Sequence, residues 1–183
     1  MTSPLESDPL TSLCGLARMC LGAASVSIAR VVDDGLYYAA ADGRGADGIV
    51  GTLLPPGAGI AGFVAATGQS LMVRDPASDP RFARDVGERV GYVPAEMHCI
   101  AVLDRDGDVT AVLSLLDRAS AGAAAEPSGS QRALEAIVDI AATLLDTAVV
   151  DDEALIQRFN ALAPTEKARV TPIVHAVLDA FER

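Results

Sequence analysis

Two apolar segments on either side of an Asp-Gly pair at positions 106–107 constrain the fold more than any other part of the sequence. Residues 97–104 read MHCIAVLD, and residues 108–117 read DVTAVLSLLD. An Asp-Gly pair between two such segments predicts a β-hairpin, because these residues tolerate the positive φ angles of a tight turn. With a two-residue loop at the tip, His98 lies opposite Leu115.

This pairing sorts the side chains of the hairpin onto two faces, since side chains alternate along a strand. One face carries His98, Ile100, Val102, Ala111, Leu113 and Leu115. The other face carries Met97, Cys99, Ala101, Leu103, Thr110, Val112, Ser114 and Leu116. Both faces are largely apolar, so we expect other layers of the protein to cover both sides of the sheet.

Hydrophobic periodicity predicts the remaining elements. Strands at 25–32 and 36–41 flank a turn signal at 33–35 and form another hairpin. The other expected elements are a helix at 10–21, a loop at 42–48, a short helix at 60–67 ended by Gly68, and a strand at 71–75. Residues 76–94 are expected to be irregular, with one helical turn after Pro80.

A linker of small residues at 119–130 precedes the last long helix. A capping box at 128–131 starts that helix, which we expect to run to about residue 150. Its apolar residues step by three and four, as do those of the first helix, which predicts that both pack against other helices. These seams are Leu134, Ile137, Ala141, Leu144 and Ala148 in the last helix, and Leu10, Leu13, Ala17 and Cys20 in the first. We divide the chain into a domain at 1–150 and a helical extension at 151–183.

The charge and cysteine content limit the partners and the compartment. The net charge of −11 argues against nucleic acid and anionic membrane, since both attract clustered positive charge. The apolar region at 133–150 is interrupted by Glu135, Asp139 and Asp146, so we do not expect it to span a bilayer. The first residues have no apolar signal core, and the three cysteines form no C-x-x-C pair. We therefore expect reduced thiols and a cytoplasmic protein.

Residues 57–62 read GAGIAG and match the G-x-G-x-x-G pattern of dinucleotide-binding turns. Asp75 follows near the spacing at which that fold holds a ribose. That fold needs a central parallel strand directly before the first glycine, but Pro55 and Pro56 stand there. The neighbouring hairpins also indicate an antiparallel sheet. We interpret the glycines as allowing a tight turn and close packing of a short helix. Whether N–H groups at the start of this helix hold an anion stays open.

Taken together, these segments resemble the GAF domain family. The resemblance covers about residues 10–150 and is densest at 54–118. It is carried by Gly59-Ile60-Ala61-Gly62, Thr67-Gly68, Asp79-Pro80-Arg81-Phe82, Gly91-Tyr92 and the final hairpin that ends in Leu115-Leu116-Asp117-Arg118. The resemblance implies an α+β sandwich with a central antiparallel sheet of five to six strands. Terminal helices would cover one face, and short helices and loops would cover a pocket on the other.

The resemblance also implies a function. We expect a non-enzymatic small-molecule sensor or regulatory dimerisation module in signal transduction, homodimeric through its terminal helices and acting on a separate effector protein. The identity of any cofactor stays unknown. One alternative is a structural partner-binding module without a ligand. Another is a thiol redox enzyme of the methionine sulfoxide reductase type, which is disfavoured because Cys14 and Cys20 fall on the first helix and only Cys99 falls in the core.

The ligand-binding candidates under this resemblance are Gly59, Phe63, Arg74, Asp75, Tyr92, Cys99 and Ser114. We expect no catalytic residue and no metal site. His98 stands alone in an apolar strand, whereas a metal needs several ligands. Cys99 could instead carry a thioether-linked bilin, and Asp75, Asp79, Tyr92 and Arg81 have the side-chain types of a mononuclear iron site. The sequence leaves open whether His98 and Cys99 face the pocket or the core.

Overall fold

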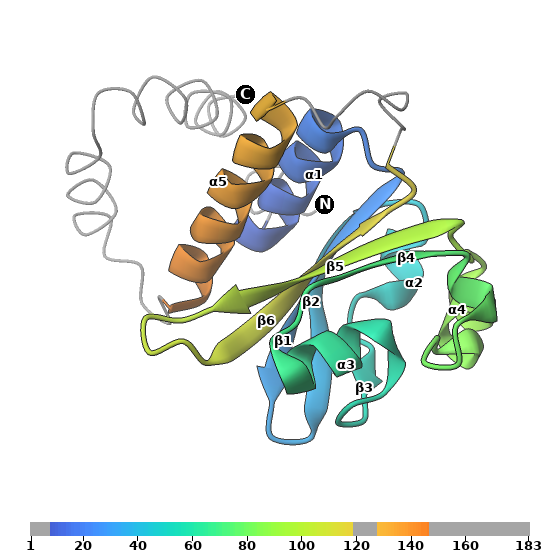
Figure 1. Ribbon diagram of the computed structural model, residues 1–183. Helices are drawn as coiled ribbons and strands as arrows, with labels where there is room; N and C mark the ends of the chain where they lie inside the picture. The colour runs from blue at the N-terminus through green and yellow to red at the C-terminus, as the bar shows by residue number, and fades with distance from the viewer. Residues whose placement is uncertain (1–7, 119–127, 147–183) are drawn as a thin grey trace, which may run out of the picture.

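The computed structural model describes residues 8–118 and 128–146 and is built on a six-stranded sheet (Figure 1). The strands follow the order β3-β2-β1-β6-β5-β4, and every neighbouring pair is antiparallel. The strands are β1 (Ser25–Val32), β2 (Gly35–Gly43), β3 (Leu53–Leu54), β4 (Leu71–Arg74), β5 (Glu96–Leu103) and β6 (Val109–Leu116). The two predicted hairpins, β1–β2 and β5–β6, meet through the β1–β6 pair at the centre of the sheet.

The helices cover the two faces of the sheet separately, as Figure 1 shows. Helices α1 (Pro9–Leu21) and α5 (Ser128–Asp146) lie side by side on one face. Helices α2 (Ala46–Ile49), α3 (Gly59–Thr67) and α4 (Arg84–Val90) lie on the other, with the 3₁₀ turn η1 (Pro76–Ser78) between β4 and α4. The predicted α+β sandwich with a central antiparallel sheet is confirmed.

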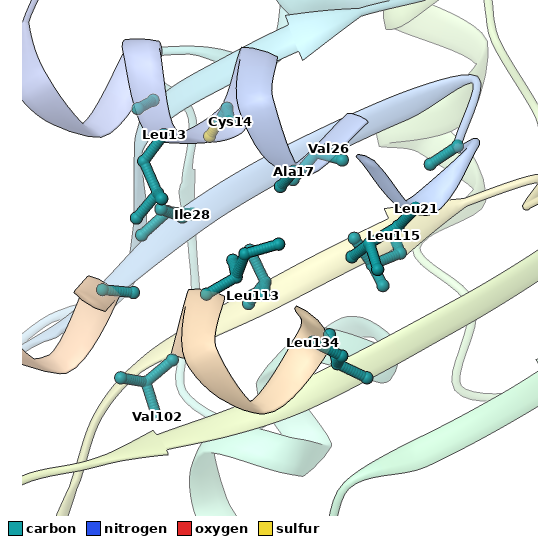
Figure 2. Close-up of a cluster of buried hydrophobic side chains, with 14 of the residues drawn as sticks. Leu13, Cys14, Ala17, Leu21, Val26, Ile28, Val102, Leu113, Leu115 and Leu134 are labelled. Atoms are coloured by element: carbon teal, nitrogen blue, oxygen red, sulfur yellow. The ribbon is translucent and has the colours of Figure 1, made fainter. Parts of the chain in front are cut away.

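The first hydrophobic core lies between the sheet and the pair α1 and α5 (Figure 2). Each helix buries most of the seam predicted from its sequence. The exception in α1 is Cys20, which is exposed, whereas the next residue, Leu21, is buried. Ala148 of the predicted α5 seam lies outside the described residues. The seam residues in this core are Leu13 and Ala17 of α1 and Leu134, Ile137 and Ala141 of α5. They pack on strand residues such as Ile28 and Leu113, both fully buried. The two seams therefore pack inside the domain, against each other and against the sheet.

The second core lies between the opposite face of the sheet and α3. It contains Leu36, Tyr38, Leu54, Ile60, Ala61, Val64, Met97, Cys99, Ala101 and Val112. The hairpin faces assigned from the sequence are confirmed, because His98 pairs with Leu115 and Cys99 pairs with Ser114. Cys99 therefore points into the second core, while His98 is on the face that carries Leu113 and Leu115.

The tip of the β5–β6 hairpin differs from the predicted two-residue loop. A register shift falls between Val102 and Leu103, and the loop covers residues 104–108. The carboxylate of Asp104 accepts hydrogen bonds from the N–H groups of Asp106 and Asp108, each at 2.9 Å. This local side-chain to backbone bonding closes the wider loop.

Three short elements were missed by periodicity. Helix α4 occupies part of the segment expected to be irregular, α2 lies in the expected loop, and β3 pairs with β2 at the edge of the sheet. In α4, a Cβ at Gly87 would lie 3.1 Å from the ring of Phe82, so the glycine makes room for that ring. Elements this short are held by tertiary contacts, and propensity alone does not reveal them.

Some predictions lie outside the described residues. These are most of the linker, the end of the last helix beyond Asp146, and the extension at 151–183. The domain boundary at 150 stays a prediction for the same reason.

Each glycine of the GAGIAG segment is required either by its backbone conformation or by a close contact with neighbouring backbone. Gly57 and Gly59 have φ angles of 73° and 75°, in the region that glycine adopts without strain. A Cβ at Gly62 would lie 2.9 Å from the carbonyl carbon of Gly57, so the preceding turn rests directly on the helix. The strand before this turn is the edge strand β3 of an antiparallel sheet, and the dinucleotide interpretation fails.

This contact predicts opposite effects for alanine at two helical glycines. Gly62→Ala should lower the free energy of unfolding by about 1–3 kcal/mol, because the methyl group meets backbone. Gly15→Ala in α1 should raise it by up to about 1 kcal/mol, since its Cβ would lie 3.7 Å from Asp42 and alanine favours helix. Urea unfolding of both variants measures the difference. Equal effects would show that the turn yields to the methyl group.

Candidate ligand-binding site

A cavity of about 80 Å³ lies between the second face of the sheet and the layer that contains α3 and α4. Its apolar wall includes Leu54, Ile60, Phe82, Val86, Val90 and Met97. Its polar lining residues are Ser25, Ser27, Tyr38, Arg44, Tyr92 and Ser114. The serines and Tyr38 come from β1, β2 and β6, so the rigid sheet forms the floor, and the segment from residue 82 to 94 forms much of the opposite wall.

Two of the hydroxyl groups in the cavity are not used by the fold. Ser27 and Tyr38 are only 6% and 7% exposed, and neither side chain hydrogen-bonds to another described residue. Burial raises the pKa of Tyr38 far above its ordinary value, so its hydroxyl stays protonated and can donate. A buried polar group normally has a partner. These two hydroxyl groups therefore favour a polar occupant of the cavity.

The N-terminus of α3 borders the same cavity. Gly59, Ile60 and Ala61 line it, and their N–H groups make no hydrogen bond to a described acceptor. The N-cap residue Ala58 has no side-chain acceptor to offer. The first N–H groups of a helix lack intrahelical partners and carry partial positive charge. This end of the cavity can therefore receive an acceptor or an anion.

Ser114 and Ser25 line the cavity but already have partners. The Oγ of Ser114 and the Sγ of Cys99 lie 3.4 Å apart in a hydrogen bond. Burial raises the pKa of Cys99 to about 11, and the bond to Ser114 opposes this only in part. The hydroxyl of Ser25 donates to the carbonyl oxygen of Asp42 at 3.3 Å.

Arg44 and Tyr92 lie together at the cavity, with the guanidinium 6.0 Å from the ring centroid. The hydroxyl of Tyr92 donates to the carboxylate of Asp117, which also accepts from the N–H groups of Ala95 at 2.7 Å and Glu96 at 2.8 Å. Burial, then the hydrogen bond and the charge of Asp117, raise the pKa of Tyr92 to about 12. Asp117 itself has a φ angle of 48° and follows the last residue of β6.

Local hydrogen bonds between Asp79 and Arg81 hold the Asp79-Pro80-Arg81-Phe82 segment beside the cavity, and we call this pair the brace. Both carboxylate oxygens of Asp79 accept from the guanidinium of Arg81, at 3.0 and 2.7 Å, and one also accepts from its backbone N–H. The guanidinium lies 4.8 Å from the ring centroid of Phe63. These hydrogen bonds lower the pKa of Asp79 to about 2.

The structure brings three of the seven predicted ligand-binding residues to the cavity, namely Gly59, Tyr92 and Ser114. The other four do not line it. Phe63 lies under Arg81, and Cys99 is buried beside Ser114. Arg74 is an exposed residue of the edge strand, 3.7 Å from Glu96 in an ion pair. The carboxylate of Asp75 accepts from Ser78, and its N–H donates to Ala95.

Sequence reasoning missed Ser27, Tyr38 and Arg44 as cavity residues. A signal for Ser27 was present, because it alternates with apolar residues in β1 and pairs with Ser114 across β6. No sequence signal separated Tyr38, which points into the second core, from Tyr37, which is 40% exposed.

The described residues contain no cluster of three or more His, Cys, Asp or Glu side chains that could hold a metal ion. The residue types considered for iron are divided between two local networks, since Asp79 binds Arg81 and Tyr92 binds Asp117.

Comparison with curated proteins finds short matches. No protein-family model matches the sequence. The chain is 29% identical over 69 residues to the dual 3′,5′-cyclic-AMP and -GMP phosphodiesterase 11A of Takifugu rubripes, a match that covers 38% of this chain. It is 29% identical over 70 residues to a cGMP-specific 3′,5′-cyclic phosphodiesterase of Drosophila erecta, again 38% of this chain. The matches span only 8% and 6% of those proteins.

Solved structures match most of the chain. The GAF domain of an Acinetobacter phosphoenolpyruvate-protein phosphotransferase superposes with a TM-score of 0.60 at 14% identity, covering 76% of this chain and 80% of that one. The protein has the GAF fold. The GAF-B domain of DevS from Mycobacterium smegmatis has a TM-score of 0.55 at 14% identity, covering 76% and 91%. A free methionine-R-sulfoxide reductase from Neisseria meningitidis has a TM-score of 0.56 at 20% identity, covering 76% and 79%.

These neighbours are GAF domains of a phosphotransferase and of DevS and a methionine-R-sulfoxide reductase, so the GAF fold alone does not decide the activity. In residues 8–118 and 128–146, no helix combines the length and the apolar character needed to cross a bilayer.

The brace predicts a pH-dependent contribution to stability. The folded-state pKa of Asp79 is about 2, below the unfolded value of about 3.9, so its ionised form favours folding. Asp79→Asn should be less stable than the wild type above about pH 4, and the gap should shrink as the pH falls toward 2. Partial exposure and salt will limit its size.

Urea unfolding across this pH range measures the gap. Asp106→Asn is the control, since its carboxylate makes no hydrogen bond within the described residues. A gap that does not change with pH would contradict the assignment of the charge to the brace.

The thiols predict a simple labelling pattern. Cys14 and Cys99 are fully buried, and burial raises their pKa values to about 12 and about 11. Because the thiolate is the reactive form, only the exposed Cys20 should react quickly with Ellman's reagent in the native protein. All three should react after unfolding. Rapid native labelling in the Cys20→Ser variant would contradict this pattern.

Proposed function

We propose that this GAF-fold protein is a non-enzymatic small-molecule sensor, a regulatory module in signal transduction that acts through a separate partner protein. The observation that carries the proposal is the cavity with its unused hydrogen-bonding groups. Ser27, Tyr38 and Gly59 to Ala61 all line it, and the two hydroxyls and the three N–H groups have no protein partner within the described residues. If the domain had only a packing role, apolar side chains that fill the cavity would stabilise it more than unpartnered polar groups do.

The cysteines argue against a thiol redox enzyme. Cys14 lies in the first core and Cys99 in the second, so the sheet separates the two buried thiols. Both are held in the unreactive protonated form by burial. The exposed Cys20 belongs to α1, on the face of the sheet opposite the cavity. A dithiol mechanism at the cavity would need two thiols there, and none of the three cysteines lines it.

Two polar connections lead away from the cavity. Ser25 donates to the carbonyl of Asp42, whose carboxylate binds Arg18 of α1. Tyr92 donates to Asp117, the residue that follows β6. A ligand that shifts Ser25 can therefore alter the contact with α1, and a ligand that shifts Tyr92 can alter the contact at the end of β6. The response would be a population shift between two arrangements of these contacts.

The cavity wall from residue 82 to 94 is the part best suited to close on a ligand. It contributes Phe82, Val86, Val90 and Tyr92, and it connects to the sheet at Asp117. We propose that ligand binding favours a closed form of the segment 75–94.

We further propose that the protein is a homodimer that pairs through the outer surfaces of α1 and α5. The apolar seams are occupied within the domain, so the pairing surface must be the outer one. Met19 of α1 is 67% exposed, and the outer side of α5 carries Glu135 and Asp139. In this arrangement the layer that forms the dimer is the one connected to the cavity.

The test combines ligand identification with a measurement of self-association. Native mass spectrometry of the purified protein would reveal a co-purified small molecule, and thermal shift with a metabolite panel would identify others. A ligand at a hundred times its Kd should stabilise the folded state by about 2.7 kcal/mol. Sedimentation velocity should show a changed dimer constant with that ligand.

Two variants sharpen the result. Ser27→Leu fills the cavity and should abolish the thermal shift, whereas Gln69→Leu, at an exposed site, should not. Tyr92→Phe keeps the ring and removes the bond to Asp117, so the ligand should still bind while its effect on the dimer constant is lost. An absent thermal shift with every metabolite, together with unchanged partner capture by Ser27→Leu, would instead support a ligand-free partner-binding module.

A further inference from the structure

The electrostatic character of the cavity is opposite to that of the chain. The protein has 25 acidic residues and a net charge of −11, yet no Asp or Glu is among the described residues that line the cavity. Its ionised lining side chain is Arg44. The carboxylate of Asp117 contacts the lining residue Tyr92, and it already accepts hydrogen bonds from Tyr92 and two backbone N–H groups. The lining therefore favours an occupant with negative charge.

The unpartnered groups of the cavity are donors. Three N–H groups at the start of α3, a helix of nine residues, carry the partial positive charge of a helix N-terminus. Ser27 and Tyr38 are residues more than nine-tenths buried, and both line the same cavity. A carboxylate accepts several hydrogen bonds and donates none, so it matches this set.

The rest of the cavity limits the charge and the size of its occupant. One arginine and one helix N-terminus suit a single negative charge better than a dianion, because the remaining wall is apolar. A volume of about 80 Å³ is well below the roughly 300–1,000 Å³ of pockets that hold drug-sized ligands, so the cavity suits a small occupant.

We propose that the cavity binds a small aliphatic monocarboxylate, with its carboxylate at the N–H groups of Gly59 to Ala61 and its alkyl part against the apolar wall. This inference rests on the proposed sensor function and adds the chemical class of the ligand. Arg44 is assigned to the recognition of the charge, and Tyr38 and Ser27 donate to the carboxylate oxygens. The small volume disfavours the cyclic nucleotides named in the curated relatives, so cyclic GMP is included as a probe in the test.

The test compares two probes of equal shape. Isovalerate carries the charge, and isovaleramide has the same alkyl part without it. Titration of the ¹⁵N-labelled protein should shift the amide signals of Gly59, Ile60 and Ala61 with isovalerate. The amide should bind about tenfold more weakly or worse, because charge-assisted hydrogen bonds are lost. Cyclic GMP should produce no shift at these amides.

Two arginine variants of the full chain separate local recognition from overall charge. Arg44→Gln should weaken isovalerate by about tenfold and leave isovaleramide nearly unchanged. Arg30→Gln removes the same charge at an exposed site of β1 outside the cavity and should leave both affinities unchanged. The prediction therefore compares the affinities of two ligands for the same variant. A general loss of stability would weaken the binding of both ligands and would not produce this difference.

The outcomes distinguish this inference from the proposed function. Equal binding of isovalerate and isovaleramide, or shifts at the α3 amides with cyclic GMP, would overturn the carboxylate assignment and leave a sensor of another ligand class. An unchanged spectrum with all three probes would also overturn it, while the metabolite panel would still decide the sensor function. Selective binding of isovalerate that Arg44→Gln abolishes supports both.

Discussion

The structure depends on a sheet that buries apolar side chains on both of its faces. The β5–β6 hairpin places Leu113 and Leu115 on one side and Cys99 and Val112 on the other, and all four are almost fully buried. Each face needs its own cover, since every buried aliphatic side chain contributes about 1.5–3 kcal/mol relative to exposure. The two covers are built differently. One consists of two long helices, and the other of short helices and turns.

This difference between the two covers explains on which face of the sheet the cavity lies. Helices α1 and α5 present continuous apolar seams, so the first core closes by the regular packing of long elements. On the second face the cover consists of helices of four, nine and seven residues joined by turns that need glycine. Such a layer exposes helix ends to the interior, and the first residues of α3 line a cavity together with Ser27 and Tyr38. A mainly apolar cavity with several polar lining groups follows from the geometry of this layer.

Two acidic residues, Asp117 and Asp42, also connect the cavity to the rest of the domain. Asp117 accepts from two backbone N–H groups and from Tyr92, and it adopts a left-handed conformation at the end of β6. Asp42 links Ser25 at the cavity to Arg18 of α1 through its carbonyl and carboxylate groups. Both acids stand at or next to the end of a strand, where the chain changes direction.

The sequence by itself determined five of the six strands, the two hairpins, the register of His98 with Leu115 and most of the helical seams, because these follow from local periodicity and turn chemistry. It also identified Gly59, Tyr92 and Ser114 as residues that the structure brings to the cavity. Only the tertiary structure decided that Tyr38 faces inward and that Arg74 and Phe63 lie elsewhere. The physical reason is that a cavity is formed by residues from four or more separate segments. Its composition depends on how short helices settle on the sheet, which no local pattern records.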